Sequence, residues 1–420
     1  MAFFVFGVLI FSGILKIGKS STQDTGPVGK VTIWGTFSAP TIFKVFEDAN
    51  SANKNLSITY IKKDDTTYQQ DLVEAFAKGT GPDLFFITPD MIVKNENFIY
   101  KIPYVSYPQK VFTDSYINGS DVFLAKDGAL GFPVVVDPIV MYYNKDLLVN
   151  EGISKPPTYW DELFDMNSKL TKKKNDGSIT QSMIALGRYD NITNAKDILA
   201  TLFIQGGNEI VKRTDTTYAP VFASGSSNKA SAVELVLNFF TEFSNPNDSG
   251  YSWNRALPQS INMFTGGKLG MYIGFASELF TIQSINPNLS FDVSEILQTR
   301  TAQTKSTYGK IYALAINKKS ANLTAAFGTV SLVSDGDNNK NFAAAVSLPP
   351  ASKANLATKP TDPYLYTFWN SAIMTHTWID PDATETSDIF SEMIGNIISN
   401  KSPVGDAINR AQSRLQQAIK

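Results

Sequence analysis

The chain contains 420 residues, of which 43% are hydrophobic and 18% are charged, so the composition excludes wholesale disorder and predicts two or three domains or two large lobes. Its 37 basic and 39 acidic residues give a net charge of −2, which lacks the basic excess of a nucleic-acid-binding protein. The absence of cysteine and the presence of one histidine, His376, exclude disulfides, thiol nucleophiles, thiolate zinc sites and multi-histidine metal sites.

The N-terminal segment 1–17 is apolar and carries no charge before Lys16. Up to Leu15 it would span about 22 Å as a helix, less than the roughly 30 Å of a bilayer core, and no basic start or small-residue cleavage site marks a complete export signal. We expect an export signal or a partial membrane anchor, with a buried helix or strand as the alternative. Residues 18–29 are small and polar, and they are expected to form a linker.

The next part of the chain alternates strands and helices. Apolar runs at 31–34, 56–61 and 83–87 predict strands. Between them, the apolar spacing predicts helices over 41–50 and 68–78, the second ending at a glycine. This βαβαβ order predicts a largely parallel sheet covered by helices, with ligands meeting the loops that follow the strands.

A second α/β lobe is predicted after an apolar run at 130–144. Pro133 and Pro138 interrupt this run, so we interpret it as an extended segment that crosses between lobes rather than as one central strand. The remaining patterns predict strands at 183–187, 268–274 and 308–317 and helices at 160–170, 192–205, 323–333, 387–399 and 404–419.

Two polar clusters invite a metal or catalytic interpretation. Residues 335–340 resemble the start of a calcium loop, but Lys340 and Val346 stand where that loop needs glycine and glutamate, so we predict a solvated turn. The carboxylates of Asp380, Asp382 and Glu385 are close enough in sequence for a glycosidase pair, but they are expected to cap the helix that follows.

The chain is rich in aromatic residues, with 5 tryptophans, 17 tyrosines and 28 phenylalanines. Flat aromatic faces stack on the CH-rich faces of sugars, which suits noncovalent capture. Trp34 at a strand end and Trp253 in a loop-like segment are the candidate ligand contacts, whereas Trp160 is expected to pack against its helix.

Several segments, in this order, resemble the sugar-binding extracellular solute-binding proteins (family 1) of ABC importers, the group that includes maltose-binding protein. The resemblance covers nearly the whole chain, and the crossing segment with its surroundings is its most specific part. The matching segments are 31–35 (VTIWG), 81–84 (GPDL), 131–133 (GFP) through 143–147 (YNKDL), 157–163 (PTYWDEL), 264–268 (FTGGK), 270–274 (GMYIG) and 378–381 (WIDP).

The resemblance implies a fold of two hinged lobes. The expected class is α/β, a type II periplasmic-binding-protein-like fold in which each lobe is a mixed, mainly parallel sheet flanked by helices. The N-terminal lobe is expected to comprise 30–135 plus 312–355, and the C-terminal lobe 136–311 plus 356–420. The lobes are expected to close over a ligand between them.

By family position, the resemblance also implies a set of ligand-binding residues. They are Trp34, Thr36, Ser38, Thr88, Asp90, Asp137, Asn191, Trp253, Gly274, Phe275, Ser277 and Tyr308. Where maltose-binding relatives carry an aromatic residue after the corresponding strand, this chain offers Phe275 and then Ala276 and Ser277, which argues against a maltose-like specificity.

We expect an extracellular or periplasmic receptor that captures a small solute, most plausibly a sugar or oligosaccharide, and delivers it to the permease subunits of an ABC importer. No catalysis and no cofactor are expected, the N-terminal segment is expected to contact the membrane, and the protein is expected to be a monomer. One alternative is a secreted carbohydrate-active hydrolase that uses Asp137 with a second carboxylate, and another is a tethered adhesion protein. Turnover of a glycoside would favour the hydrolase, and saturable binding without product would favour the receptor.

Overall fold

The computed structural model describes residues 28–214, 217–223 and 232–419, and these divide into two compact units. Unit 1 runs to Val136 and resumes over Lys310–Pro360. Unit 2 comprises Asp137–Gly309 and Thr361–Lys420. The chain therefore passes from one unit to the other inside two strands, β6 (Phe132–Asn144) and β13 (Thr307–Ile316), and again after Pro360.

The predicted lobe boundaries, 135/136, 311/312 and 355/356, stand beside unit boundaries at 136/137, 309/310 and 360/361. The predicted N-terminal segment 1–17 and most of the predicted linker 18–29 lie outside the described residues. In the part of the chain that the structure describes, no helix has both the length and the apolar character needed to cross a membrane.

Unit 1 contains a four-stranded arrangement in the order β2, β1, β3 and β13. β1 (Gly29–Gly35) pairs in parallel with both β2 (Leu56–Lys62) and β3 (Leu84–Ile87), whereas β13 pairs antiparallel to β3. The predicted βαβαβ order is therefore confirmed. The longer helices of unit 1 are α2 (Ala39–Ala52), α3 (Tyr68–Lys78), α12 (Leu323–Ser334) and α13 (Gly336–Val346), and the shorter elements are α4 (Ile92–Asn95), β4 (Ile102–Pro103), α5 (Gln109–Ser115), β5 (Gly128–Ala129) and α14 (Lys353–Leu356).

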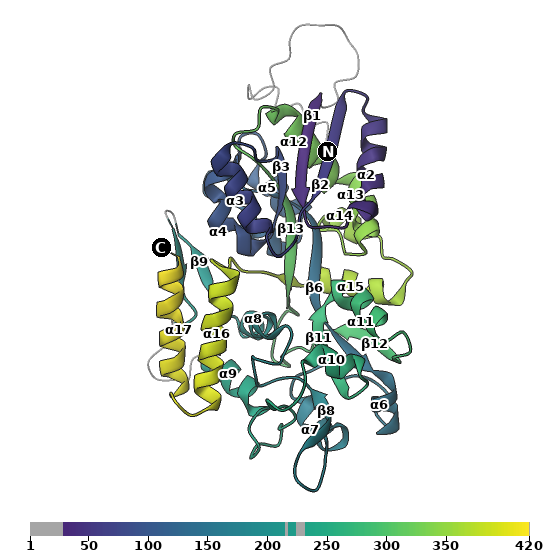
Figure 1. The fold of residues 1–420 in the computed structure, drawn as a ribbon, viewed down its shortest axis with the longest axis vertical. Coiled ribbons are helices and arrows are strands. Elements are labelled where there is room, and N and C mark those ends of the chain that lie inside the picture. The colour runs from purple at the N-terminus through teal and green to yellow at the C-terminus, as the bar shows by residue number, and fades with distance from the viewer. Residues whose placement is uncertain (1–27, 215–216, 224–231, 420) are drawn as a thin grey trace. The chain divides into compact units, whose positions relative to one another are not determined.

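Local sequence explains the first two helices of unit 1. In α2, which lies along β2 in Figure 1, the residues spaced for one face, Ile42, Val45, Phe46 and Ala49, are all buried. α3 covers the predicted range and ends at Gly79, whose φ of 70° is the left-handed conformation in which glycine closes a helix.

The solvated turn predicted over 335–340 is wrong. Asp335 is the N-cap of α13, and Gly336 through Lys340 form the first turns of that helix. The side chain of Asp335 accepts a hydrogen bond from the main-chain N–H of Gly336 at 2.8 Å. Aspartate and asparagine favour turns and helix N-termini alike, so the same residues fit either structure when the apolar pattern after them is weak.

The sheet of unit 2 is mixed. β11 (Leu269–Phe275) pairs antiparallel to β6 and parallel to β8 (Ile179–Ile184). β12 (Phe291–Glu295) pairs antiparallel to β6, and β7 (Lys172–Lys173) pairs antiparallel to β8. The strand predicted at 183–187 is thus observed earlier in the chain, because the buried end of β8 was mistaken for the whole strand.

β6 corrects the prediction that 130–144 is not a single strand. It is one continuous strand of 13 residues, nearly all buried. Its pairing with β11 begins at Ile139 and its pairing with β12 begins at Val140, so Pro138 precedes both ladders. In unit 1, Val136 donates its N–H to Pro349 and the carbonyl of Val134 accepts from Ala351. Pro138 lies outside the ladders with β11 and β12, and Pro133 makes neither of the hydrogen bonds to Pro349 and Ala351, so the prolines do not interrupt these contacts.

Helices flank the strands of unit 2. They are α6 (Lys145–Asn150), α7 (Glu162–Leu170), α8 (Ala195–Gln205), α9 (Ala232–Glu242), α10 (Ser260–Thr265), α11 (Leu279–Ile285), α15 (Pro363–Ile373), α16 (Ala383–Ile398) and α17 (Val404–Ala418), with short strands β9 (Val211–Arg213), β10 (Tyr218–Pro220) and β14 (Thr375–His376). The last two helices lie side by side (Figure 1) and are linked by an ion pair of 2.7 Å between Arg414 and Glu385.

Asp380 and Asp382, the two carboxylates before α16, have separate structural roles. The side chain of Asp382 caps α16 by accepting hydrogen bonds from the N–H groups of Thr384 and Glu385 at 3.1 and 3.2 Å, as expected of a helix cap. The buried Asp380 instead forms an ion pair of 2.7 Å with Lys196 at the start of α8. This pair ties the first turn of α8 to the segment that leads into α16.

Candidate functional site

In unit 1, the predicted ligand-binding residues follow two neighbouring strands. Thr36 and Ser38 come directly after β1, and Thr88 and Asp90 come directly after β3. Because β1 and β3 are adjacent and parallel, both loops leave the sheet at the same edge. The hydroxyl of Thr88 donates to the carboxylate of Asp90. The structure thus brings four of the predicted residues to one edge of unit 1.

Trp34 lies at the same edge, near the end of β1, and tyrosine hydroxyls bind the backbone at and around it. The hydroxyl of the buried Tyr68 lies within hydrogen-bond distance of the carbonyl oxygens of Trp34, at 3.0 Å, and Phe86, at 2.9 Å. The hydroxyl of Tyr60 donates to the carbonyl of Phe37 at 3.0 Å. Burial raises the pKa of both tyrosines, so both hydroxyls stay protonated and able to donate.

A lysine occupies one face of the Trp34 ring. The ammonium nitrogen of Lys63 lies 3.7 Å from the ring centroid, which is a cation–π contact. The same ammonium forms an ion pair of 3.3 Å with Asp71 on α3. The ring predicted to stack on a ligand is therefore only partly exposed and is covered on one face by a charged side chain.

In unit 2, a second group of predicted residues lies around the end of β11. The main-chain N–H of Ser277 donates to the carboxylate of the buried Asp137 at 2.9 Å. Gly274 and Phe275 close β11 opposite β6, and the Phe275 and Tyr308 rings meet edge to face with their centroids 6.3 Å apart. The structure brings these five residues together within unit 2.

Glu278 follows this turn directly and accepts hydrogen bonds from three groups. The amide of Asn194 donates to Oε1 at 2.8 Å, the N–H of Phe275 donates to the same oxygen at 3.2 Å, and the hydroxyl of Tyr272 donates to Oε2. Burial raises the pKa of Glu278, and these bonds offset the rise only in part. A Cβ at position 274 would lie 2.7 Å from Oε2, so glycine is required for this close approach.

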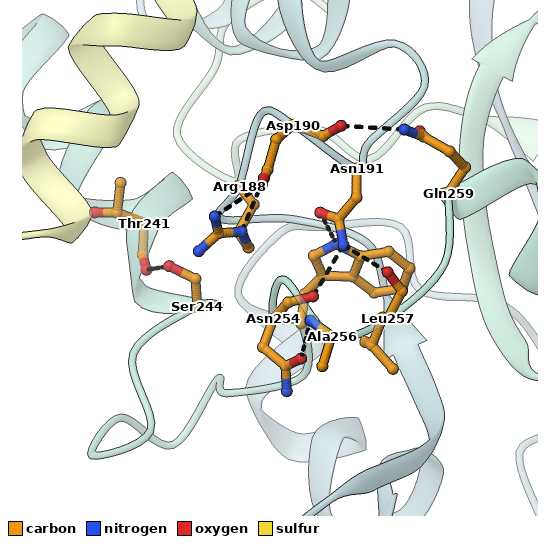
Figure 2. A network of polar contacts seen from close by, with 10 residues as sticks. Arg188, Asp190, Asn191, Thr241, Ser244, Asn254, Ala256, Leu257 and Gln259 are labelled. Atoms are coloured by element: carbon orange, nitrogen blue, oxygen red, sulfur yellow. Dashed lines mark hydrogen bonds and ion pairs between the residues drawn. The ribbon is translucent and has the colours of Figure 1, made fainter.

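Asn191 and Trp253 contact each other in a different part of unit 2. Trp253 is fully buried and its indole N–H donates to the Asn191 side-chain oxygen at 2.9 Å. Figure 2 shows the Asn191 amide pointing to the carbonyls of Asn254 and Leu257, to which it donates at 2.9 and 3.0 Å. In this conformation the Trp253 ring offers no surface to a ligand, and the Asn191 side chain supports the loop.

The sequence alone did not single out Lys63, Asn194, Tyr272 or Glu278. Glu278 directly follows the predicted ligand-binding residue Ser277, so its place in the sequence could have identified it as a candidate. Lys63 follows β2 in a run of four charged residues, in which nothing marks it as different from its neighbours. Its contact with Trp34 arises from the pairing of β1 with β2, in which Trp34 lies opposite Ile61, two residues before Lys63.

We predict that Asn191→Ala lowers the free energy of unfolding by about 3 kcal/mol, because it leaves the buried Trp253 N–H and two carbonyls without their partner. Urea denaturation followed by tryptophan fluorescence measures the change. Gln259→Ala is the control, since Gln259 is exposed in the same network and donates only to the carbonyl of Asp190 at 3.1 Å. Equal stability of the two variants would contradict the role assigned to Asn191.

We predict that Glu278→Gln flattens the pH dependence of stability. Because the native pKa of Glu278 is raised, the folded protein binds this proton more tightly than the unfolded chain does. The free energy of unfolding therefore falls as pH rises from the ordinary value of 4.5 to the native pKa, and glutamine removes this loss. Urea denaturation from about pH 4 to about pH 7 tests this, with the exposed Glu47→Gln as control. A wild-type protein that gains stability over Glu278→Gln as pH rises would contradict it.

Two curated relatives are similar to this chain, one over nearly its whole length and one over about two thirds of it. A Brucella abortus chain named as a binding protein is 22% identical over 436 aligned positions, which cover 98% of each chain. The galactooligosaccharide-binding protein of Bacillus subtilis is 22% identical over 273 positions, covering 64% of this chain and 61% of that one.

Solved structures show the same fold. The cyclic alpha-maltosyl-1,6-maltose binding protein of Arthrobacter globiformis superimposes with a TM-score of 0.76 at 17% identity, covering 94% of this chain and 100% of that one. The predicted two-lobed, periplasmic-binding-protein-like α/β fold is thereby confirmed. The family model for bacterial extracellular solute-binding proteins matches residues 44–364, from α2 to the start of α15. Because that match spans most of the chain, this protein belongs to the bacterial extracellular solute-binding protein family.

Proposed function

We propose that this protein is the sugar receptor of an ABC importer, which captures a neutral oligosaccharide outside the cytoplasm and delivers it to a membrane permease without changing it chemically. Membership of the extracellular solute-binding family supports the receptor role. The names of the Bacillus subtilis and Arthrobacter globiformis proteins support an oligosaccharide as the ligand. The N-terminal segment would tether or export the receptor, which would act as a monomer.

The observation that carries this proposal is the composition of the two groups of loop residues. In unit 1, Trp34, Thr36 and Ser38 at the end of β1 share one edge of the sheet with the Thr88–Asp90 pair after β3. In unit 2, Phe275 and Tyr308 lie near the Asp137–Ser277 contact, and both rings are buried in this conformation. Aromatic faces for the CH faces of a sugar, with carboxylates and hydroxyls for its hydroxyl groups, are the chemistry that saccharide binding needs.

We propose that one ligand draws contacts from both groups of loops. A ligand that contacts both units stabilises the arrangement in which both sets of contacts are made, and the permease then recognises that arrangement. Hinge motion would involve the segments where the chain changes units, within β6, within β13 and after Pro360. The permease would thus detect the solute because binding increases the population of the arrangement that it recognises, without a chemical step.

The hydrolase alternative depends on Asp137. One oxygen of this buried carboxylate accepts the N–H of Ser277, which suits a fixed acceptor better than an acid or base that must exchange protons with water. Product analysis separates the two functions, because a receptor returns its ligand unchanged whereas a hydrolase releases shorter sugars.

We predict that the full chain binds at least one neutral oligosaccharide of glucose, galactose or mannose saturably and without product. At roughly 100 times its dissociation constant, such a ligand stabilises the native state by about 2.7 kcal/mol, which a thermal-shift screen detects. Amino acids, spermidine and phosphate are the control ligands, and chromatography of the recovered sugar tests for turnover. Stabilisation by none of the saccharides, or release of shorter sugars, would contradict the proposal.

A further inference from the structure

We propose that Lys63 is a displaceable cap on Trp34, which a neutral saccharide must push aside before it can stack on the indole ring. This inference rests on the proposed function and adds a residue that sets its affinity and its preference among sugars. Trp34 is a predicted ligand-binding residue, whereas no role for Lys63 follows from the sequence alone.

The position of Lys63 is fixed by the backbone around it. Trp34 lies opposite Ile61, and Gly35 opposite Lys62, in the parallel pairing of β1 with β2. The next residue, Lys63, donates its main-chain N–H to the carbonyl of Gly35 at 2.8 Å. The lysine side chain therefore starts beside Trp34, and its ammonium reaches a point 3.7 Å from the ring centroid.

The two partners differ in freedom of movement. Trp34 is held by the hydrogen bond from Tyr68 to its carbonyl and by pairing with strands on both sides. The Lys63 ammonium is held over the ring by the cation–π contact and by the ion pair with Asp71, at the end of a flexible, partly exposed side chain with four rotatable carbon–carbon bonds. The indole ring therefore projects from a fixed backbone, and the flexible lysine side chain is the part that moves more easily.

Asp71 makes displacement inexpensive. It lies on α3 and forms an ion pair of 3.3 Å with Lys63, and its own side chain is 37% exposed. When the ammonium leaves the ring, it keeps this partner and gains water, so no buried charge is left unpaired. Displacement then costs the cation–π contact alone, which is weak at a partly exposed site.

The lysine ammonium and a sugar compete for the same face of the indole ring, so only one of them can occupy it at a time. The negative face of an indole attracts an ammonium and the polarised C–H groups of a sugar for the same reason, and one face accommodates one of them. Because Asp71 already neutralises Lys63, and Asp64 and Asp65 follow in the chain, the site has no excess positive charge to favour an acidic sugar. The cap therefore selects neutral saccharides with an apolar face.

The first measurement needs no ligand. Acrylamide quenching of the Trp34 contribution, obtained by subtracting the corresponding Trp34→Phe protein in each background, reports access to the ring. We expect Lys63→Met to increase this quenching relative to wild type. Lys62→Met, which removes a neighbouring charge from an exposed position of β2, is the control and should leave it unchanged.

The second measurement is the affinity of the full chain for maltotetraose and galactotetraose by titration calorimetry. We expect Lys63→Met to bind about three- to tenfold more tightly than wild type, and Lys62→Met and Lys63→Arg to show no such gain, because arginine keeps a cation on the ring.

Each outcome decides a different claim. Saccharide binding that is unchanged or weaker in Lys63→Met overturns the cap and leaves the receptor function in place. Absence of saccharide binding in all four proteins overturns the receptor function, and the displacement step with it. Unchanged quenching in Lys63→Met shows that Lys63 does not cover the ring in the free protein, which overturns the cap whatever the affinity.

Discussion

One buried hydroxyl organises the ligand side of unit 1. Tyr68 reaches from α3 to the carbonyl oxygens of Trp34 and Phe86, which stand near the ends of the neighbouring strands β1 and β3. Burial makes this contact obligatory, because a buried tyrosine hydroxyl without a partner would be costly. The loops that carry the polar candidate residues leave the sheet from these two strand ends, so their relative position follows from this contact.

Unit 2 achieves the same kind of order with carboxylates. Asp137 holds the turn after β11 through the N–H of Ser277, and Glu278 holds the same turn through Phe275 and the start of α8 through Asn194. Both carboxylates fix the main chain of this turn by accepting its N–H groups. A site whose backbone is fixed before binding loses less entropy when a ligand binds. Each unit therefore holds its own group of candidate loop residues with hydrogen bonds made inside that unit.

Apolar periodicity correctly predicted the helices that bury one regular face. Predictions that depended on a single residue, such as a proline or a tryptophan, were less successful. α2 and α3 follow from apolar spacing and a closing glycine. Pro138 suggested a break in β6, but the ladders with β11 and β12 begin after it, and register is not visible in sequence. Likewise, the burial of Trp253 depends on its partner Asn191, 62 residues away, and the cap on Trp34 depends on how far a lysine side chain reaches. Such contacts are tertiary, so no local pattern encodes them.

The central claim is that one saccharide draws on the loops of both units. Small-angle X-ray scattering of the full chain, with and without an oligosaccharide whose saturation has been established by calorimetry, tests it most directly. The account predicts that the radius of gyration falls when the ligand binds, because contacts to both units favour a closed arrangement. An unchanged radius of gyration at proven saturation would contradict it, since a ligand held by one unit alone has no means of moving the other.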